Sequence, residues 1–518
     1  MKKIYVFSLL LFVTEVLSAQ TVSDMVRFSS TSSSGSARVA AMGGAFGALG
    51  GDLSAVGINP AGTGVFEKPE LSITPSYNFA RVKADGRHAK KNSFQLGTLG
   101  GVMVFHLNDS RWKKINLAIN YSSSANFNRI SHQSVSNSPT SFNQIWSLEA
   151  NRDLQSALNS PTPPEELDFS QLLNARSQMA YNTGLISYNE FQGAFEPTLL
   201  AGEEVEQRKY IRETGFQGEC NFSIGTDYDD KLYLGFSVGI CTIDYKYKSV
   251  FTGYGIEQNG NINYFGLDCY NFGQDLKTKA LGTNFKFGVM YHPIPELNIG
   301  ASVQTPTFYS SSDKYTENMH SSFFEADENG CYGYDSYIIP VKYDYDMRTP
   351  WKAMFSVATT LFQQLVISAD YEYMNYSSAK FCNGADGYDF SESDGSGAND
   401  LIKTTLKNVH NFRIGTEYSF NKMLCLRGGY SYMGSPYKQS LFPTYLVCDM
   451  ETQAASLGCG LDFGRFYVDV ALIYKFSKDI DTSYFYQNPS DSDYDVIAKP
   501  IHNKYTDYTG KVSVGFKL

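Results

Sequence analysis

Apolar and polar residues alternate one by one along many stretches of the second half of the chain. In "FYVDVALIYKF", residues 466–476, every even-numbered position is apolar, whereas the odd-numbered positions include Asp469 and Lys475. Successive side chains of a β-strand point to opposite faces, so this segment predicts a strand with one apolar and one mixed face. The same alternation recurs within 232–240, 284–291 and 411–420. Such strands are typical of a wall between lipid and water.

The alternation predicts 14 strands, each able to cross a bilayer at a tilt, which takes about 9–11 residues. They span 70–82, 94–107, 114–122, 215–227, 231–247, 278–292, 296–310, 338–359, 364–376, 408–420, 424–434, 451–463, 466–477 and 507–518. Pro350 interrupts one of them, and proline cannot donate to a strand ladder. We keep 338–359 as one strand because bacterial single-chain barrels have an even strand number.

The connections between these strands alternate in length. Links such as 293–295 and 421–423 are short, whereas links such as 248–277 and 478–506 are long and polar. Short periplasmic turns and long outer loops are the arrangement of an up-and-down transmembrane barrel. A propeller would require a repeat of about 40–50 residues, which is not found, and sandwich strands usually have about 5–6 residues. The fold class predicted is all-β, a 14-stranded antiparallel transmembrane β-barrel.

Composition agrees with a barrel and excludes some functions. Aromatic residues make up 15% of the chain, with 37 Tyr and 36 Phe, and charged residues only 19%; this favours strands with aromatic girdles. The net charge is -10 and the sequence has no basic cluster, so nucleic acid is excluded as a partner on electrostatic grounds.

The first residues carry the pattern of a secretory signal. Lys2 and Lys3 precede an apolar run, and a small residue, Ala19, stands at a plausible cleavage point; we therefore expect a signal peptide at 1–19. The glycine-rich stretch "AMGGAFGALGGDLSAVGINPAG" follows at 41–62, and its glycines fit neither a dinucleotide fingerprint nor a P-loop.

Small side chains allow a segment to pack tightly inside a lumen. We expect 20–69 to form an N-terminal hatch and 70–518 to form the barrel. The segment 123–214 carries helical patterns at 141–158 and 163–186, which predict a small, partly helical extracellular insertion.

The stretch from Ser36 to Gly62, with its Asn-Pro-Ala sequence, resembles the start of the FadL/TodX family of outer-membrane transporters. The resemblance implies passive uptake of long-chain fatty acids or other hydrophobic small molecules across the Gram-negative outer membrane. The implied route is an apolar pocket, a movable hatch and a lateral opening in the wall. The resemblance makes the following residues candidate ligand or hatch residues: Gly43, Gly44, Phe46, Asn59, Pro60 and Ala61.

Basic residues on the inferred inner faces of strands are candidate partners for a carboxylate. The position parity places Lys286, Arg413, Arg427 and Lys511 inside. A lysine or arginine on the lipid face would destabilise the barrel by about 2–4 kcal/mol at the bilayer midplane.

Other functions remain as alternatives. The chain could be a haemin-receptor-like binding protein, with loop histidines His88, His132 and His320, or a barrel component of a protein secretion system. Ser237 lies in a Gly-x-Ser-x-Gly match, but within an alternating strand and not at a sharp turn. We therefore expect no enzymatic activity, no cofactor and no metal. The expected partners are a hydrophobic ligand and outer-membrane lipid, and the expected state is a monomer.

Eight cysteines form neither a C-x-x-C pair nor a zinc spacing. Four lie in predicted outer loops: Cys269, Cys331, Cys382 and Cys448. Any disulfides should form among these four, which allows three pairings, and free thiols are the alternative.

Overall fold

The computed structural model describes residues 21–30, 35–108, 110–160, 168–200, 203, 205–255, 263, 265–392, 397–438, 450–486 and 495–518. The predicted signal peptide and Cys448 lie outside these residues.

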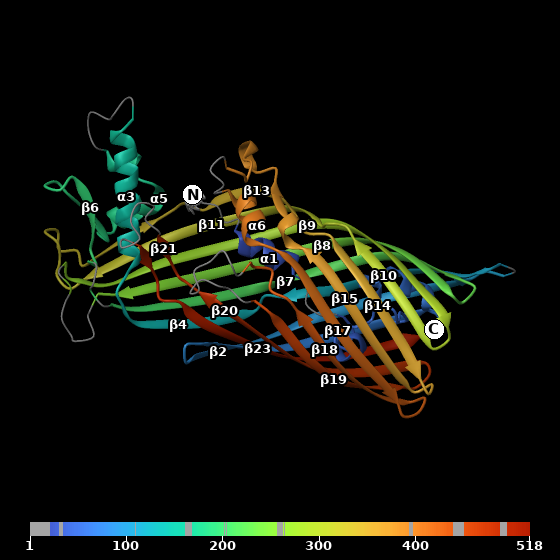
Figure 1. The fold of residues 1–518 in the computed structure, drawn as a ribbon. Coiled ribbons are helices and arrows are strands. Elements are labelled where there is room, and N and C mark those ends of the chain that lie inside the picture. Colours follow the sequence, from blue (N-terminus) through green and yellow to red (C-terminus); the bar gives the residue numbers. More distant parts are fainter. Residues whose placement is uncertain are drawn as a thin grey trace, which may run out of the picture.

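The chain forms a closed antiparallel barrel of 14 passes, as the alternation predicted (Figure 1). The first strand, β1 (Glu70–Ala84), pairs with β2 on one side and with the last strand, β23, on the other, which closes the barrel. The other unbroken passes are β2 (Arg87–His106), β3 (Trp112–Asn126), β7 (Val205–Tyr228), β8 (Leu232–Tyr254), β9 (Leu267–Ile294), β15 (Leu365–Asn375), β17 (Asn408–Ser419), β18 (Leu424–Met433), β19 (Thr452–Asp462), β20 (Phe466–Asp481) and β23 (Ile501–Lys517).

Two neighbouring passes are each built from two strands. They are β10 (Leu297–Gln304) with β11 (Phe308–Phe323), and β13 (Val341–Arg348) with β14 (Lys352–Leu361). The interruptions contain Pro306 and Pro350, which lack the N–H that a ladder needs. The amide of Thr307 donates to Thr349 Oγ1 (2.9 Å), and the Thr349 amide donates to the Thr307 carbonyl (3.2 Å). Two hydrogen bonds therefore connect the two interruptions. The predicted span 338–359 is therefore one pass but two strands.

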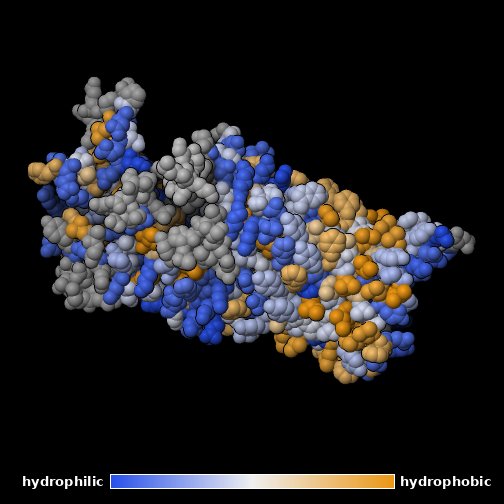
Figure 2. Space-filling model, viewed as in Figure 1, coloured by the Kyte–Doolittle hydropathy of each residue, from blue (hydrophilic) through white to orange (hydrophobic). Residues whose placement is uncertain are grey.

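A belt of exposed apolar side chains surrounds one part of the barrel. Figure 2 shows hydrophobic residues gathered over the part that holds β14, β17, β18 and β19, whereas the part that carries helix α3 is mainly hydrophilic. Leu457 and Leu472 on this belt are 70% and 67% exposed, while the neighbouring Asp469 and Ala471 are buried inside. Apolar side chains that face outward at this density indicate a lipid-facing surface.

Several strands continue beyond the belt on the side of the long loops, where a small cap sits (Figure 1). The cap contains α3 (Phe142–Leu158), α4 (Phe169–Leu172), α5 (Ala175–Asn182) and the hairpin of β5 (Ile186–Asn189) and β6 (Ala194–Pro197). Phe142 and Trp146 of α3 pack against Phe272 of β9, and Phe142 also packs against Phe251 of β8. Of the predicted insertion 123–214, the ends continue β3 and β7, and β4 (Arg129–Ser138) pairs with β7.

The cap buries one carboxyl group, that of Glu149 in α3. Burial raises its pKa to about 7, with a further contribution from Asp153. The charge of Arg152 opposes this effect, and that of Glu317 in β11 adds to it.

Short elements complete the outer loops: β12 (Gly333–Tyr337), β16 (Lys380–Cys382), α6 (Ala398–Thr405), β21 (Phe485–Tyr486), β22 (Val496–Ile497) and the 3-10 turns η3 (Tyr376–Ser378) and η4 (Ala385–Gly387). The N-terminal helix α1 (Val22–Ser29) lies at the outer mouth, where Met25 and Phe28 pack in an apolar cluster with loop and wall residues such as Tyr245. Among the described helices, none has the length and hydrophobicity needed to cross a bilayer.

Candidate functional site

The glycine-rich segment folds into a compact body inside the barrel, residues 35–66, which we call the hatch. It contains α2 (Ala37–Ala41) and the 3-10 helices η1 (Ala55–Gly57) and η2 (Pro60–Val65). Ser36 caps α2, since its Oγ accepts from the Val39 amide (3.2 Å). The chain reverses after α2 at Gly43 and Gly44, whose φ angles of +65° and +81° lie in the left-handed region that favours glycine.

The Asn-Pro-Ala sequence builds the second turn of the hatch. Asn59 is 1% exposed, and its Oδ1 accepts from the Ala61 amide (3.1 Å) as the cap of η2, with Pro60 in the first helical position. Its Nδ2 donates to the Gly47 carbonyl within the hatch (2.7 Å) and to the Val289 carbonyl of β9 (3.3 Å). One side chain thus joins two parts of the hatch to the wall.

Glycines of the wall meet the backbone of the hatch at close range. A Cβ at any of four inner-face positions would overlap hatch atoms of Met42, Gly43, Asn59 or Pro60; the four positions are Gly235, Gly288, Gly415 and Gly429. The absence of side chains on the wall therefore allows main chain to pack against main chain.

Polar side chains of the wall then hold the hatch amides. The carboxylate of Asp370 in β15 accepts from the amides of Phe46 (3.0 Å) and Gly47 (3.1 Å). Ser456 Oγ of β19 accepts from the Gly43 amide (3.1 Å) and donates to the Ala41 carbonyl (2.9 Å).

An ionic cluster joins the hatch to the wall at its periplasmic side. Arg38 of α2 donates through two nitrogens to Glu417 of β17, both at 2.9 Å. Arg427 of β18 donates to the same Glu417 and to Asp469, both at 2.5 Å. A bidentate arginine–carboxylate pair is a strong, geometrically specific contact.

Lys511 also holds the hatch, because its Nζ donates to the Gly35 carbonyl (2.9 Å). The four candidate cations therefore divide into two groups. Lys511 binds the hatch directly and Arg427 binds Glu417, the wall partner of Arg38, whereas Lys286 and Arg413 line a cavity on the outer side of the hatch.

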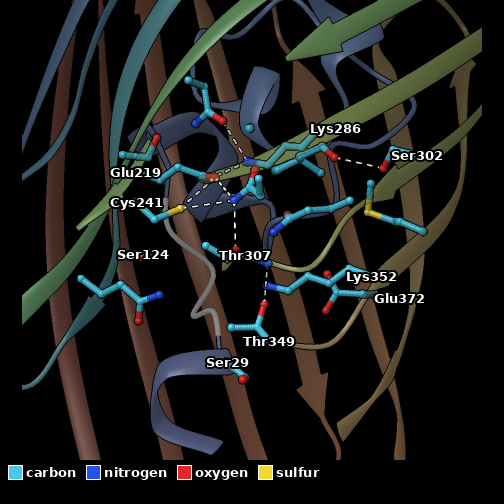
Figure 3. Close-up of a pocket in the computed structure, with 18 of the residues that line it drawn as sticks. Ser29, Ser124, Glu219, Cys241, Lys286, Ser302, Thr307, Thr349, Lys352 and Glu372 are labelled. Atoms are coloured by element: carbon cyan, nitrogen blue, oxygen red, sulfur yellow. Dashed lines mark hydrogen bonds and ion pairs between the residues drawn. The ribbon is translucent and has the colours of Figure 1, made fainter. Parts of the chain in front are cut away.

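That cavity has a volume of about 120 Å³, and its lining combines charged and amide side chains with apolar ones such as Phe28, Ile58 and Met354 (Figure 3). Lys286 pairs with Glu219 at 2.6 Å, and Arg413 pairs with Glu372 at 3.0 Å. Lys352 lines the same cavity. The lining therefore carries three cations and two carboxylates, so its formal charge is positive.

Three amide side chains of the cavity have a polar atom without a hydrogen-bond partner among the described residues. They are Gln217 at Oε1, Asn221 at Nδ2 and Asn284 at Oδ1, all at most 5% exposed. Buried polar groups are normally paired, so these three atoms are unused hydrogen-bonding capacity beside the cavity. The cavity beside the hatch thus combines charged and amide groups with apolar side chains.

The backbone pairing of the wall is interrupted next to this cavity. β2 and β3 pair from His106–Lys114 only as far as Thr98–Ser122, and residues 87–96 of β2 pair with β1 alone among the described strands. Beyond that point side chains bridge the two sides, as in the bond from Asn126 Nδ2 to Ser93 Oγ (2.9 Å).

The sequence around this interruption explains its place. Pro75 in β1 produces a register shift against β2, where Gly97 is left over as a bulge. A Cβ at Gly97 would meet the Thr74 carbonyl oxygen at 2.9 Å. Ser122 and Ser124, on the other side of the interruption, line the cavity. Cavity and wall interruption are therefore contiguous.

Sequence reasoning missed two charged residues of the cavity. The alternation of 215–227 could have placed Glu219 inside, because it shares its parity with the buried Asn221 and Ser223. Lys352 follows the break at Pro350, where the alternation of inward and outward positions is interrupted. Counting positions from the start of that pass therefore does not show which face Lys352 occupies.

The remaining sequence candidates are scattered. The described cysteines are all free thiols, including Cys269, Cys331 and Cys382. The histidines proposed for haem, His88, His132 and His320, lie on three different strands, β2, β4 and β11. Within the described residues, no group of three or more His, Cys, Asp or Glu side chains could hold a metal ion.

Known proteins share this architecture. The chain matches the family model of the outer membrane protein transport protein (OMPP1/FadL/TodX) over residues 14–506. No curated protein matches it significantly. A solved FadL homologue of Pseudomonas aeruginosa is 11% identical with a TM-score of 0.52, and the match covers 93% of this chain and 98% of that one.

Two toluene transporters also align with it. They are TodX of Pseudomonas putida and TbuX of Ralstonia pickettii, each 14% identical with a TM-score of 0.48, covering 93% of this chain and 98% of theirs. At these identities the FadL homologue shows a common fold, and the family model carries the assignment. The chain belongs to the outer membrane protein transport family (OMPP1/FadL/TodX), the outer-membrane channels for hydrophobic compounds.

Proposed function

We propose that this channel admits long-chain fatty acids, or amphiphiles of the same shape, and releases them sideways through the wall between β2 and β3. One observation carries the proposal: the interruption at Thr98–Ser122 adjoins the cavity that the hatch borders. A lumen guest at this place would have a short path to the bilayer.

The chemistry of the two neighbouring surfaces supports an amphiphilic guest. Burying a methylene group is favourable by about 0.8 kcal/mol, so a tail of about 15 methylenes prefers an apolar environment by on the order of 10 kcal/mol. The cavity, with its charged and amide groups, offers an acyl tail less apolar surface than the lipid beyond the wall does. A carboxylate, in contrast, finds Lys286, Lys352 and Arg413 around the cavity.

The hatch supplies the gate in this proposal. Gly44 and Ile58 of the hatch line the cavity from below, and Phe28 and Ser29 of α1 line it too. Movement of either element would change the volume available to a guest, and the hatch is held to the wall by hydrogen bonds and ion pairs that can re-form.

A disulfide across the wall interruption tests the lateral route. In the variant Ser93→Cys/Asn126→Cys, the two sulfur atoms take the places of Ser93 Oγ and Asn126 Cγ, in side chains that now meet through the Nδ2–Oγ hydrogen bond of 2.9 Å. Oxidation should suppress uptake of labelled oleate by cells, and a reductant should restore it, because the link closes the path between β2 and β3.

The matched control is Phe105→Cys/Ile115→Cys, which links the same two strands where they are already paired. This link should leave uptake unchanged. Equal uptake by the oxidised and reduced forms of the first variant would contradict the lateral route.

A further inference from the structure

Four adjacent strands carry basic residues on their outward faces just beyond the lipid-facing belt. Lys83 of β1 lies opposite His88 of β2 on one side and opposite Lys504 of β23 on the other. Lys504 in turn lies opposite Lys478 of β20. With their outward neighbours these side chains form what we call the basic patch, and all are exposed: Arg81, Lys83, His88, Lys90, Lys478, His502 and Lys504.

The basic patch lies at a defined depth. An aromatic row of Phe79, Tyr508 and Tyr474 crosses three of these strands, β1, β23 and β20, with ring centroids 6.2 Å and 5.3 Å apart. On β1 the cations begin two residues after this row, at Arg81. Two residues of strand span about 6.7 Å, or about 5 Å of depth at the usual barrel tilt. Aromatic girdles mark the membrane interface, so the patch lies at the level of lipid headgroups on the extracellular side (Figure 1).

Protein carboxylates do not neutralise the basic patch. Within the described residues, none of its lysines or its arginine lies within ion-pair distance of a carboxylate. Some outward lysines of the opposite wall are paired, Lys248 with Asp275 at 3.4 Å and Lys342 with Asp344 at 2.8 Å. Lys246 and Lys279 of that wall are exposed and, like the patch lysines, have no ion pair among the described residues.

A surface hollow of about 600 Å³ lies within the patch and is lined by Lys83, Lys478, His502 and Lys504. Two carboxylates border it. Asp85 lies at the hairpin tip between β1 and β2, and Asp479 accepts a hydrogen bond from the Tyr505 hydroxyl (2.9 Å). The concave surface thus presents ammonium groups without a carboxylate partner among the described residues toward the depth where lipid headgroups lie; Lys478 Nζ lies over the Phe476 ring, 5.4 Å from its centroid.

We propose that the basic patch binds the phosphorylated headgroup of an outer-leaflet lipid of the lipid A type. Phosphate groups pair well with lysine and arginine, and each basic residue near an anionic bilayer surface strengthens attachment by roughly fivefold. The acyl chains of such a lipid would lie along the apolar belt below, beside Phe79 and Tyr508, while its phosphates reach the hollow.

Binding of lipid A to the purified full-length protein in detergent tests this assignment. The variant Lys83→Gln/Lys504→Gln removes two cations of the hollow without breaking any ion pair, so the barrel should fold. We expect its affinity for lipid A, measured by native mass spectrometry, to fall on the order of tenfold or more. Dephosphorylated lipid A should bind both proteins equally and weakly.

The matched control is Lys246→Gln/Lys279→Gln, which removes two exposed lysines from β8 and β9 on the opposite wall. It should leave lipid A affinity unchanged. An equal loss in both variants would assign the binding to net charge alone and overturn the proposal. Displacement of lipid A by inorganic phosphate, beyond the effect of a chloride salt at equal ionic strength, would assign the hollow to free phosphate and also overturn it.

Discussion

The attachment of the hatch should depend strongly on a single buried amide, that of Asn59. Replacing it by alanine removes three hydrogen bonds: the cap bond from the Ala61 amide and the donations to the carbonyls of Gly47 and Val289. The side chain is 1% exposed, so water does not replace these bonds in the closed state.

The cost follows from the kinds of bond lost. Loss of a helix cap costs about 1 kcal/mol, and a buried carbonyl left without its donor costs about 1–3 kcal/mol. Val289 also belongs to the paired strands β9 and β10, so its carbonyl does not depend on Asn59 alone. Most of the cost of an unpaired carbonyl therefore comes from Gly47. A total of about 2–4 kcal/mol raises the population of detached hatch by about 30-fold to 900-fold.

Hydrogen exchange reports this population directly, because buried amides exchange through local opening. In Asn59→Ala, amides of the hatch such as those of Phe46 and Gly47 should exchange faster by that factor, while amides of the barrel strands keep their rates. If detachment is part of transport, uptake of labelled oleate should rise as well.

A buried asparagine elsewhere provides the control. Asn399 of α6 is 5% exposed and makes two bonds to the backbone of Phe381, at 2.8 Å and 2.9 Å. Asn399→Ala should loosen its own loop and leave hatch exchange unchanged. Unchanged hatch exchange in Asn59→Ala, or equal acceleration in both variants, would refute the reasoning.

Three further results are expected. In a binding titration, Arg413→Ala should weaken binding of oleate but not of oleyl alcohol, since Glu372 is left unpaired beside the carboxylate of oleate. The control Gln304→Ala, which changes an uncharged cavity residue, should affect the two ligands equally. The pKa of Glu149 is about 7 in the folded cap and near 4.5 when unfolded, so the folded cap holds a proton that the unfolded chain releases between these values. Cap stability should therefore fall by at most about 3 kcal/mol as pH rises through this window and level off above it; Glu149→Gln should abolish the dependence in exchange of α3 amides, and a retained dependence would contradict the assignment. Leu457→Lys should destabilise the barrel by about 2–4 kcal/mol in a refolding titration, with Leu457→Phe as the near-neutral control and equal stability of the two as the contrary result.

Features set by neighbouring residues along one strand could be predicted from the sequence. In β20 the alternation placed Asp469 inside and Leu472 outside, and the structure agrees. The two-residue period is a local property of extended backbone, so it needs no knowledge of the partner strand. The hatch is expected on other grounds, namely the small side chains of 41–62, which can pack tightly in a lumen, and the resemblance of 36–62 to the start of the FadL/TodX family.

Features set by register between distant strands could not be predicted. The basic patch brings Lys83 beside Lys504, which are far apart in sequence, so no cluster is visible in the chain itself. The wall interruption depends on where pairing of β2 with β3 stops, at Thr98–Ser122. Pro75 and Gly97 explain that point once the pairing of β1 with β2 is known, but the sequence does not show that these two residues meet.

The cap shows a third limit. The helical pattern of 163–186 includes two short helices, α4 and α5, in its described part. Asn174 separates them, because its Oδ1 accepts from the amides of Arg176 and Ser177 and starts α5 anew. Hydrophobic spacing alone does not detect such a restart, although asparagine is a preferred capping residue.

The contact between wall glycines and hatch backbone has a consequence for the vacated lumen. If the hatch moves away, Gly235, Gly288, Gly415 and Gly429 would leave strips of bare main chain along the inside of the cylinder. Nothing at those positions could swing inward to fill the space or catch a passing acyl chain. The glycines that let the hatch pack tightly against the wall would then also give the open lumen a smooth inner surface.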